Sequence, residues 1–263
     1  MEISQIGLRN QNKRKLGLIS RFLFSPQNFI YEILSNFIMT EKEAEDLCRM
    51  IRVGVDLSKK YHPETREELR DLIEELIKER GNKADLNDVD VSQIKDMNYL
   101  FFGSQFNGNI SNWNVSKVEN MRGMFRASKF NGNISSWDVS KVKEMNSMFE
   151  SSQFNGDISS WDVSKVKGMS GMFAFSKFNG DISKWDVSRV ENMSEMFQGS
   201  KFNGDISKWD VSGVVSMSGM FSYSQFKGDI PNWNVSRVVS MSGMFWRSKF
   251  NGNISKWAKK PTE

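Results

Sequence analysis

Two columns of acidic residues recur at intervals of 24 residues and could, by type and spacing, bind a metal ion. One follows a tryptophan (Asp138, Asp162, Asp186 and Asp210), and the other closes the glycine-containing motif of the same repeats (Asp157, Asp181, Asp205 and Asp229). Stacked carboxylates are typical of calcium-binding repeats. However, other repeats carry asparagine at these positions, as at Asn114 and Asn133, so the shared feature is the side-chain oxygen. We therefore expect hydrogen bonds within turns, with no metal site and no cofactor.

The remaining candidates for chemistry are a single histidine, His62, and a single cysteine, Cys48. Neither has a second His or Cys nearby in the sequence, so His62 is expected to be a solvated linker residue and Cys48 a small core residue. The sequence contains no phosphate-binding loop, dinucleotide fingerprint or serine-nucleophile motif. We therefore expect a protein that is not an enzyme and has no catalytic residues.

A strict period places these residues on a repeating framework. Seven tryptophans stand 24 residues apart, at positions 113, 137, 161, 185, 209, 233 and 257. The consensus of the full repeats is M-x-x-M-F-x-x-S-x-F-N-G-[ND]-I-x-x-W-[ND]-V-S-x-V-x-x, with Lys227 in place of Asn in one of them. One degraded repeat precedes Met97, and a partial one follows Ser240. A period of this length predicts a solenoid in which each repeat is one circuit. Because Trp, Met and Phe recur at apolar spacings, ladders of these side chains are expected to form the core.

The spacing within a repeat predicts its local structure. Trp185 and Val187 alternate as in a short strand, and Val190, Met193 and Met196 follow helical spacing. Asn203-Gly204 is a turn signal. One strand and one short helix per repeat is the leucine-rich-repeat plan, so the predicted fold class is an α/β solenoid with a parallel β-strand stack.

The repeat motif resembles the BspA-like leucine-rich repeat, a mycoplasma-type lipoprotein repeat of bacterial surface proteins, over residues 84–257. The resemblance implies adhesion or partner binding without catalysis, and a location at the cell surface or outside the cell. No conventional export leader is expected, because Arg21 interrupts the apolar stretch in "KRKLGLISRFLF", and this favours the cytoplasm. The two indications leave the location open. No apolar run reaches the ~18 residues of a membrane span.

Three regions are predicted from the organisation of the chain. Residues 1–82 form a helical N-terminal region with helices over 25–39, 40–54 and 63–81, the last serving as an α-helical cap. Residues 83–257 form the repeats, and 258–263 form a short polar tail. The C-terminal end has no such helix, which leaves a homodimer through that end as one expectation.

Binding residues are sought where the repeats differ, because the recurring positions belong to the framework. The first variable column follows Met-Phe and comprises Phe102, Arg126, Glu150, Ala174, Gln198, Ser222 and Trp246. The second variable column is the next position and comprises Gly103, Ala127, Ser151, Phe175, Gly199, Tyr223 and Arg247. Aromatic and arginine side chains on a surface are typical contact anchors, which selects Phe175, Tyr223, Trp246, Arg126 and Arg247. Groove filling between repeats is the alternative interpretation.

Two further sets of residues could contact a partner. Lys184 and Lys208 flank the tryptophans beside Asp186 and Asp210, and the leucine-rich-repeat plan places them on a concave surface suited to a protein or glycan. A basic column (Lys117, Lys141, Lys165, Arg189 and Arg237) could contact an acidic partner or nucleic acid. The net charge of +4 is too small to favour nucleic acid. The predicted function is protein–protein interaction, with a surface adhesin for host matrix protein or glycan, or nucleic-acid binding, as alternatives.

Overall fold

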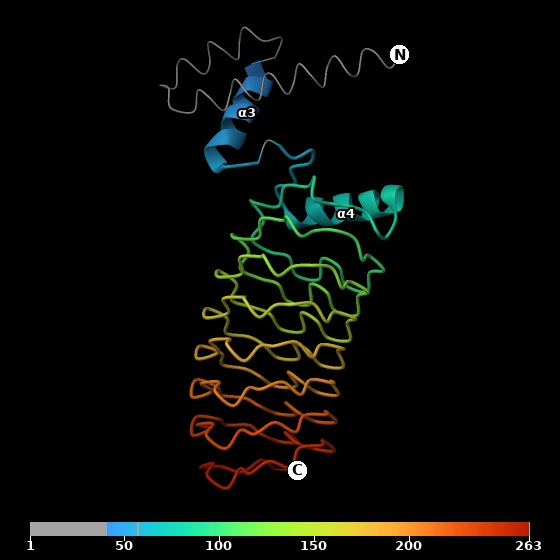
Figure 1. Ribbon diagram of the computed structural model, residues 1–263. Helices are drawn as coiled ribbons and strands as arrows, with labels where there is room; N and C mark the ends of the chain where they lie inside the picture. Colours follow the sequence, from blue (N-terminus) through green and yellow to red (C-terminus); the bar gives the residue numbers. More distant parts are fainter. Residues whose placement is uncertain (1–40, 57, 263) are drawn as a thin grey trace. The chain divides into compact units, whose positions relative to one another are not determined.

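The computed structural model describes residues 41–56 and 58–262. It divides the chain into two compact units, Met1–Ser58 and Lys59–Glu263, and each is considered by itself. In the first unit the described residues contain helix α3 (Glu41–Val53), which confirms the helix predicted over 40–54. The helix predicted over 25–39 lies outside the described residues. The second unit contains helix α4 (Arg66–Arg80) and all the repeats (Figure 1).

Helix α4 begins and ends where its sequence predicts. The Thr65 side chain accepts a hydrogen bond from the backbone N–H of Glu68, and Gly81 ends the helix with φ of 83°. Leu69, Ile73 and Leu76 are fully buried and belong to the same apolar cluster as the repeats. Two arginines then bind this helix to the first repeats. Arg66 donates to the carbonyl of Asn98 (2.8 Å), and Arg80 donates to the carboxylate of Asp88 (3.1 Å).

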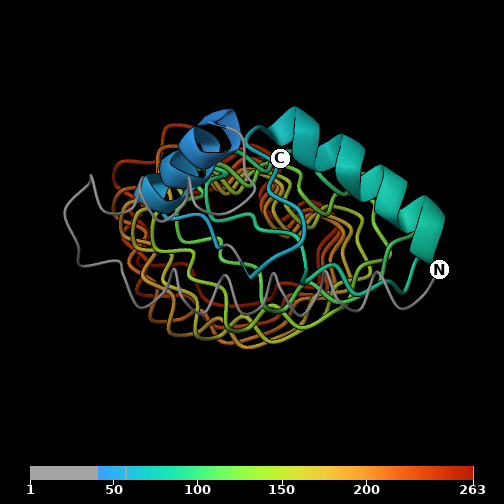
Figure 2. The same ribbon diagram turned by 90° about the horizontal axis from the view of Figure 1, so that it is seen from above.

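The repeats stack as successive circuits of the chain (Figure 1), and Figure 2 shows their paths superimposed when viewed from above. One segment of each repeat carries most of the backbone hydrogen bonds between neighbours. In one repeat the donors are every second N–H, those of Met121, Gly123, Phe125 and Ala127. They reach carbonyls 23 residues further on at 2.7–2.9 Å, and the pattern recurs in the repeats that follow.

The predicted fold class, a leucine-rich-repeat-like parallel β-strand stack preceded by an α-helical cap, is wrong. The described residues contain two helices and isolated parallel bridges, such as Asn120 to Glu144, but no sheet. The reason is the backbone of the bonded segment. Its third and seventh residues have positive φ in each repeat, as at Gly123 (59°) and Ala127 (56°). A residue with positive φ cannot continue an extended strand, so the segment folds as consecutive tight turns.

Two local predictions are corrected by the same observation. The short helix expected around Val190–Phe197 is absent, because Met196 donates to the carbonyl of Met193 in a tight turn and Glu195 has φ of 58°. The strand expected at the tryptophan is also absent, since the backbone N–H of Trp185 donates to the carbonyl of Ile182 (3.2 Å). The inward orientation of these residues is nevertheless confirmed. Trp185 and Val187 are buried, while Asp186 between them is exposed.

Stacked aromatic rings fill the core, as the recurring Phe and Trp positions predict. Phe149 and Phe173 stack with centroids 5.7 Å apart, and Trp113 and Trp137 stack at 6.3 Å. Each repeat tryptophan also donates its indole N–H to a carbonyl of the preceding repeat, 27 residues earlier, at 2.9–3.3 Å. The bond satisfies the polar atom of a side chain that is otherwise fully enclosed. Burial of the tryptophan ladder is thereby confirmed.

The Asn-Gly pair has a different role from the turn that its sequence predicts. A Cβ at Gly132 would lie 2.8 Å from the ring of Phe130 and 3.0 Å from the carbonyl oxygen of Gly108. The glycine therefore leaves room for the buried ring and for the preceding repeat. The asparagine forms a ladder, in which the side-chain oxygen of Asn107 accepts from the backbone N–H of Asn131 (2.9 Å). The same bond continues from repeat to repeat until the backbone N–H of Lys227 donates to the side-chain oxygen of Asn203.

Replacing Trp161 by Phe tests the indole hydrogen bond. The variant removes the indole donor, leaves the buried carbonyl of Ile134 with only the backbone N–H of Trp137 (3.2 Å), and loses packing volume, so we expect the free energy of unfolding to fall by roughly 2–4 kcal/mol. The matched control is Trp246→Phe at an exposed tryptophan, which should change it by less than about 0.5 kcal/mol. Denaturant unfolding measures both. Equal effects at the two sites would refute the role of the indole bond.

Replacing Lys227 by Asn tests the asparagine ladder. Lysine has no side-chain acceptor, so the ladder cannot pass through this position to Asn251. The asparagine should add one hydrogen bond and raise the free energy of unfolding by about 0.5–1.5 kcal/mol. Lys227→Ala is the control, because it removes the charge without supplying an acceptor. If the alanine variant gained as much stability as the asparagine variant, charge rather than the ladder would explain the effect.

Candidate functional site

The two acidic columns hold tight turns. In both columns the side-chain oxygen of an Asp or Asn accepts from the backbone N–H two residues later, as between Asp138 and Ser140 (3.0 Å). Asn114 makes the same bond to Ser116 at 3.2 Å, which confirms that the oxygen rather than the charge is needed. Asp229 departs from the pattern because Pro231, two residues later, has no N–H to donate.

The same hydrogen bonds keep several of these carboxylates charged. The hydroxyl and then the backbone N–H of Ser140 hold the pKa of Asp138 below its usual range. Equivalent serines lower the pKa of Asp162 and Asp210, again with the hydroxyl as the larger cause. In residues 41–56 and 58–262, no group of three or more His, Cys, Asp or Glu side chains is arranged to hold a metal ion.

The two residues considered for catalysis precede the repeats in the sequence and belong to none of the columns. His62 is partly buried, with Nδ1 3.6 Å from the carboxylate of Asp90, so the expectation of a solvated linker residue is wrong. The backbone of this segment is fixed to the first repeat, since the backbone N–H of Asp90 donates to the carbonyl of Tyr61 (2.8 Å). Cys48 lies in α3, within the first unit.

The variable columns lie on the segment of consecutive tight turns. All seven residues of the second variable column have positive φ, between 53° and 65°. Two of them are glycine, which adopts this conformation freely, but Phe175, Tyr223 and Arg247 pay a steric penalty of roughly 1–2 kcal/mol each. Phe175 is 55% exposed, Tyr223 41% and Trp246 47%. Phe175 and Tyr223 therefore stand in solvent on a backbone that favours glycine.

Aromatic and arginine side chains gather in two clusters on these columns. The C-terminal cluster comprises Tyr223, Trp246 and Arg247: the two rings meet edge to face at 4.9 Å, and the guanidinium lies 4.7 Å from the Trp246 ring. The N-terminal cluster comprises Tyr99, Phe102 and Arg126. Its guanidinium lies 5.9 Å from the Phe102 ring and also forms an ion pair with Glu150 (2.8 Å).

Phe175 lies between the two clusters along the chain and contacts the following repeat. Its ring occupies the space where a Cβ at Gly199 would stand, 2.5 Å from the ring carbons. Glycine at position 199 thus gives the exposed ring a flat surface to rest on. Tyr99 lies on Gly123 in the same way, at 2.4 Å. Each ring covers a neighbouring repeat and keeps most of its outer side in solvent, so exposure and groove filling coexist.

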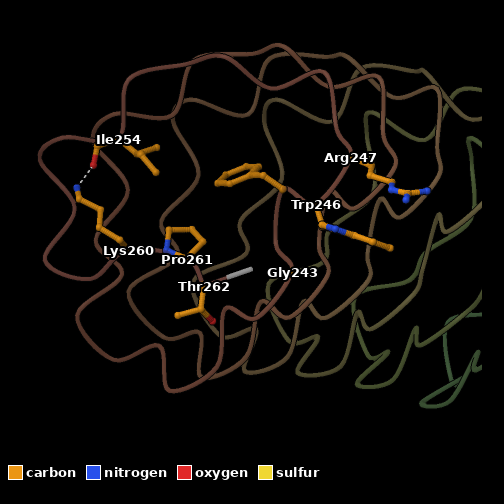
Figure 3. Close-up of a pocket in the computed structure, with 8 residues that line it drawn as sticks. Gly243, Trp246, Arg247, Ile254, Lys260, Pro261 and Thr262 are labelled. Carbon is orange, nitrogen blue, oxygen red and sulfur yellow. Dashed lines mark hydrogen bonds between the residues drawn. The ribbon is translucent and has the colours of Figure 1, made fainter.

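The last repeat forms a hollow beside the C-terminal cluster, shown in Figure 3. Its lining residues are Gly243, Phe245, Trp246, Arg247, Ile254, Lys260, Pro261 and Thr262. The Lys260 ammonium donates to the carbonyls of Ile254 and Trp257, and the carbonyl of Thr262 accepts from the N–H of Gly243 (2.8 Å). In the other repeats the N–H at the position of Gly243 donates to a carbonyl of the following repeat, and here the carbonyl of Thr262 takes that place. The predicted homodimer through this end remains a prediction.

The other predicted contact residues occupy a different segment of the repeat. Lys184, Lys208, Asp186 and Asp210 are exposed and flank the buried tryptophans. Asp186 and Asp210 accept from the backbone N–H groups of Ser188 and Ser212, so each carboxylate already has a structural task. Their predicted placement on a concave face depended on the leucine-rich-repeat plan. Because that plan is wrong, the placement has no remaining basis.

Sequence reasoning overlooked Tyr99 and Phe102 as members of a cluster. The sequence nevertheless carried a signal for the third and seventh residues of the segment of consecutive tight turns. Glycine alternates with large side chains at two positions of the repeat, at Gly103 and Gly199 and at Gly123 and Gly171. Such alternation indicates a left-handed backbone position, where side chains other than glycine need a separate reason.

The fold and these clusters define a protein of stacked repeats with an exposed aromatic and arginine surface. Residues 70–177 and 173–263 each match the family model described as Mycoplasma protein of unknown function, DUF285, and the chain belongs to this family. No curated protein and no solved structure was found to match it. Within the described part of the chain, no helix has the length and apolar character needed to cross a membrane.

Replacing Asp138, Asp162 and Asp210 together by Asn tests the turns. A lowered pKa stabilises the fold above the unfolded-state value of about 3.9, and this contribution is lost as the pH falls through the folded-state value. The asparagine variant keeps the oxygens and removes the titration. Its Tm should lie slightly below that of the parent at about pH 7, where the charged carboxylates contribute, and should fall less as the pH approaches about 3.

The control for the turns is the corresponding triple alanine variant, which lacks the oxygens. It should have a lower Tm than the parent at every pH above about 4, because the three hydrogen bonds from the backbone N–H groups of Ser140, Ser164 and Ser212 are lost with the side chains. An asparagine variant with the same acid sensitivity as the parent would show that these carboxylates do not carry the pH dependence.

Proposed function

We propose that the chain is a non-catalytic protein-binding module whose partner contacts the two variable columns. The observation that carries the proposal is the presence of exposed Phe175 and Tyr223 at backbone positions with positive φ. Folding alone favours glycine there, and Gly103 and Gly199 occupy the same column. Strained, exposed aromatic residues at such positions favour a role other than the stability of the chain.

The surroundings of these side chains suit a binding surface. The rings stand on a framework with an almost fully buried core, so their positions are fixed before a partner arrives. Aromatic residues and arginine are the types that carry most binding energy at protein interfaces. The Arg247 guanidinium lies 4.7 Å from the ring of Trp246 and 5.7 Å from that of Tyr223, which orders all three side chains further.

The resemblance of the repeat motif to BspA-like repeats adds support of a different kind. Those repeats occur in bacterial surface proteins that serve in adhesion or partner binding. Adhesion to a host protein is accordingly one form that the proposed binding could take. Nothing in the clusters favours a glycan or a host matrix protein over another protein partner.

Alanine replacement of Phe175, Tyr223 and Trp246 together tests the proposal. The immobilised full chain is used to capture proteins from a lysate, and capture is quantified by mass spectrometry. A specific partner should be captured at least about tenfold less by the variant, because the anchors of the interface are gone. The free energy of unfolding should stay within about 1 kcal/mol of the parent, since the three side chains are exposed.

The matched control is Val239→Ala, an exposed apolar residue outside both variable columns. It should capture the same partner as fully as the parent. If the triple variant and the parent captured every protein equally, the variable columns would not be the binding surface. Equal losses in the triple variant and in Val239→Ala would point to a non-specific hydrophobic effect instead.

A further inference from the structure

We infer that the C-terminal half of the variable columns binds an extended acidic segment of a partner protein; this inference rests on the proposed function. Its first basis is the charge of the adjoining surface. Two residues after the second variable column, each repeat carries a lysine or a glutamine. We call the lysines the lysine column: Lys129, Lys177, Lys201 and Lys249. Every one of them is exposed, and no repeat has an acidic residue at this position.

Within the described part of the chain, the cations of this surface form no ion pair with a carboxylate. Among the residues that the structure describes, no ion pair involves the lysine column, Lys227 or Arg247. Elsewhere the repeats pair their cations across neighbouring circuits, as Lys143 does with Glu119 (2.6 Å) and Lys167 with Glu191 (3.1 Å). The C-terminal half of the columns therefore leaves its positive charge available to an anionic partner.

The arginines of the two clusters differ in whether a carboxylate neutralises them. Arg126 in the N-terminal cluster is neutralised by Glu150 at 2.8 Å. Arg247 in the C-terminal cluster contacts only aromatic rings among the interactions described for it. A guanidinium held over rings by its flat face keeps its N–H donors free at the edge, where a carboxylate binds. The site for the acidic segment is thus Arg247 with Tyr223 and Trp246, extended by the neighbouring lysines.

The ring geometry favours a protein segment over a nucleic acid. Single-stranded nucleic acids bind where bases can stack on open aromatic faces. Here Tyr223 meets Trp246 edge to face, with 79° between the ring planes, and Arg247 covers one face of Trp246. In addition, the second acidic column follows four residues after the lysine column, and hydrogen bonds from serines lower the pKa of Asp181 and Asp205. Those charged carboxylates would repel any polyanion that extended over them, so the acidic segment is confined to the variable columns and the lysine column.

The length of the surface sets the length of the segment. From the repeat of Phe175 to that of Arg247 there are three steps, and the core phenylalanines of these repeats stack at 5.6–5.8 Å. The span is therefore about 17 Å, which an extended chain covers with about five residues at ~3.3 Å each. Two or three carboxylates alternating with apolar side chains would meet the lysines and the exposed rings together.

Fluorescence anisotropy with the full chain and a labelled ten-residue peptide of alternating Glu and Leu tests the inference. We expect saturable binding that weakens at least about tenfold in Arg247→Ala and again when salt is raised from about 50 to about 500 mM. Alanine can adopt the positive φ of this position, since Ala127 occupies the same column with φ of 56°. The substitution therefore removes the guanidinium without changing the backbone. The matched control Arg126→Ala removes a neutralised arginine and should change the Kd less than about twofold.

Two further probes discriminate the alternatives. A peptide with Lys in place of Glu should not bind, and a ten-nucleotide oligothymidylate should bind more weakly than the acidic peptide. Tighter binding of the oligonucleotide, no binding of the acidic peptide, or equal effects of Arg247→Ala and Arg126→Ala would each overturn the inference.

The failure of this inference is distinguishable from failure of the proposed function. A captured protein partner that depends on Tyr223 and Trp246, but not on Arg247 or salt, would leave the binding module standing and remove the acidic segment. If capture and peptide binding were both independent of the aromatic residues, both proposals would fail.

Discussion

The hydrogen bond from each indole N–H to a carbonyl of the preceding repeat is the constraint on which the structure depends. It ties a large buried ring to one particular atom of its neighbour, at 2.9–3.3 Å in all seven repeats. A buried indole N–H without an acceptor would be costly. Insertion of a residue between two tryptophans would break this register, which accounts for the strict 24-residue period.

The other contacts between repeats have the same one-to-one character. The backbone bonds of the turn segment, the asparagine ladder and the stacked phenylalanines each join a residue to its equivalent in the next repeat or to a neighbour of it. Stability is therefore distributed along the stack in similar portions. Because these contacts use the recurring positions of the repeat, the variable columns can change from repeat to repeat.

The backbone of the turn segment links the fold to the proposed binding surface. Positive φ at its third and seventh residues directs two side chains of each repeat outward and excludes a β-strand. Where these residues are glycine the conformation carries no steric cost, and a neighbouring ring can rest on the flat backbone, as Phe175 does on Gly199. Glycine in one repeat thus supports an aromatic side chain in another, and the pair positions the exposed ring.

The sequence by itself determined the period, the buried Trp, Phe and Met ladders, the helices α3 and α4 and the turn-forming role of Asn114 and Asp138. These features follow from side-chain type and spacing alone, because each depends on residues close together in the sequence or on a strictly repeated position. The exposed aromatic and arginine residues could also be selected from the sequence, because they interrupt columns that are otherwise small or polar. Their membership in clusters with Tyr99 and Phe102 could not, since it depends on neighbours a full repeat away.

The tertiary structure alone decided the form of the backbone within each repeat. Alternation at Trp185 and Val187 fits a strand and a chain of tight turns equally well, because both place alternate side chains inward. The choice between them came from the stacking of repeats. Every second N–H of the turn segment is satisfied by the next repeat and the others close tight turns, so left-handed residues are accommodated without a sheet. That balance of hydrogen bonds is a property of the stack, and a single repeat does not contain it.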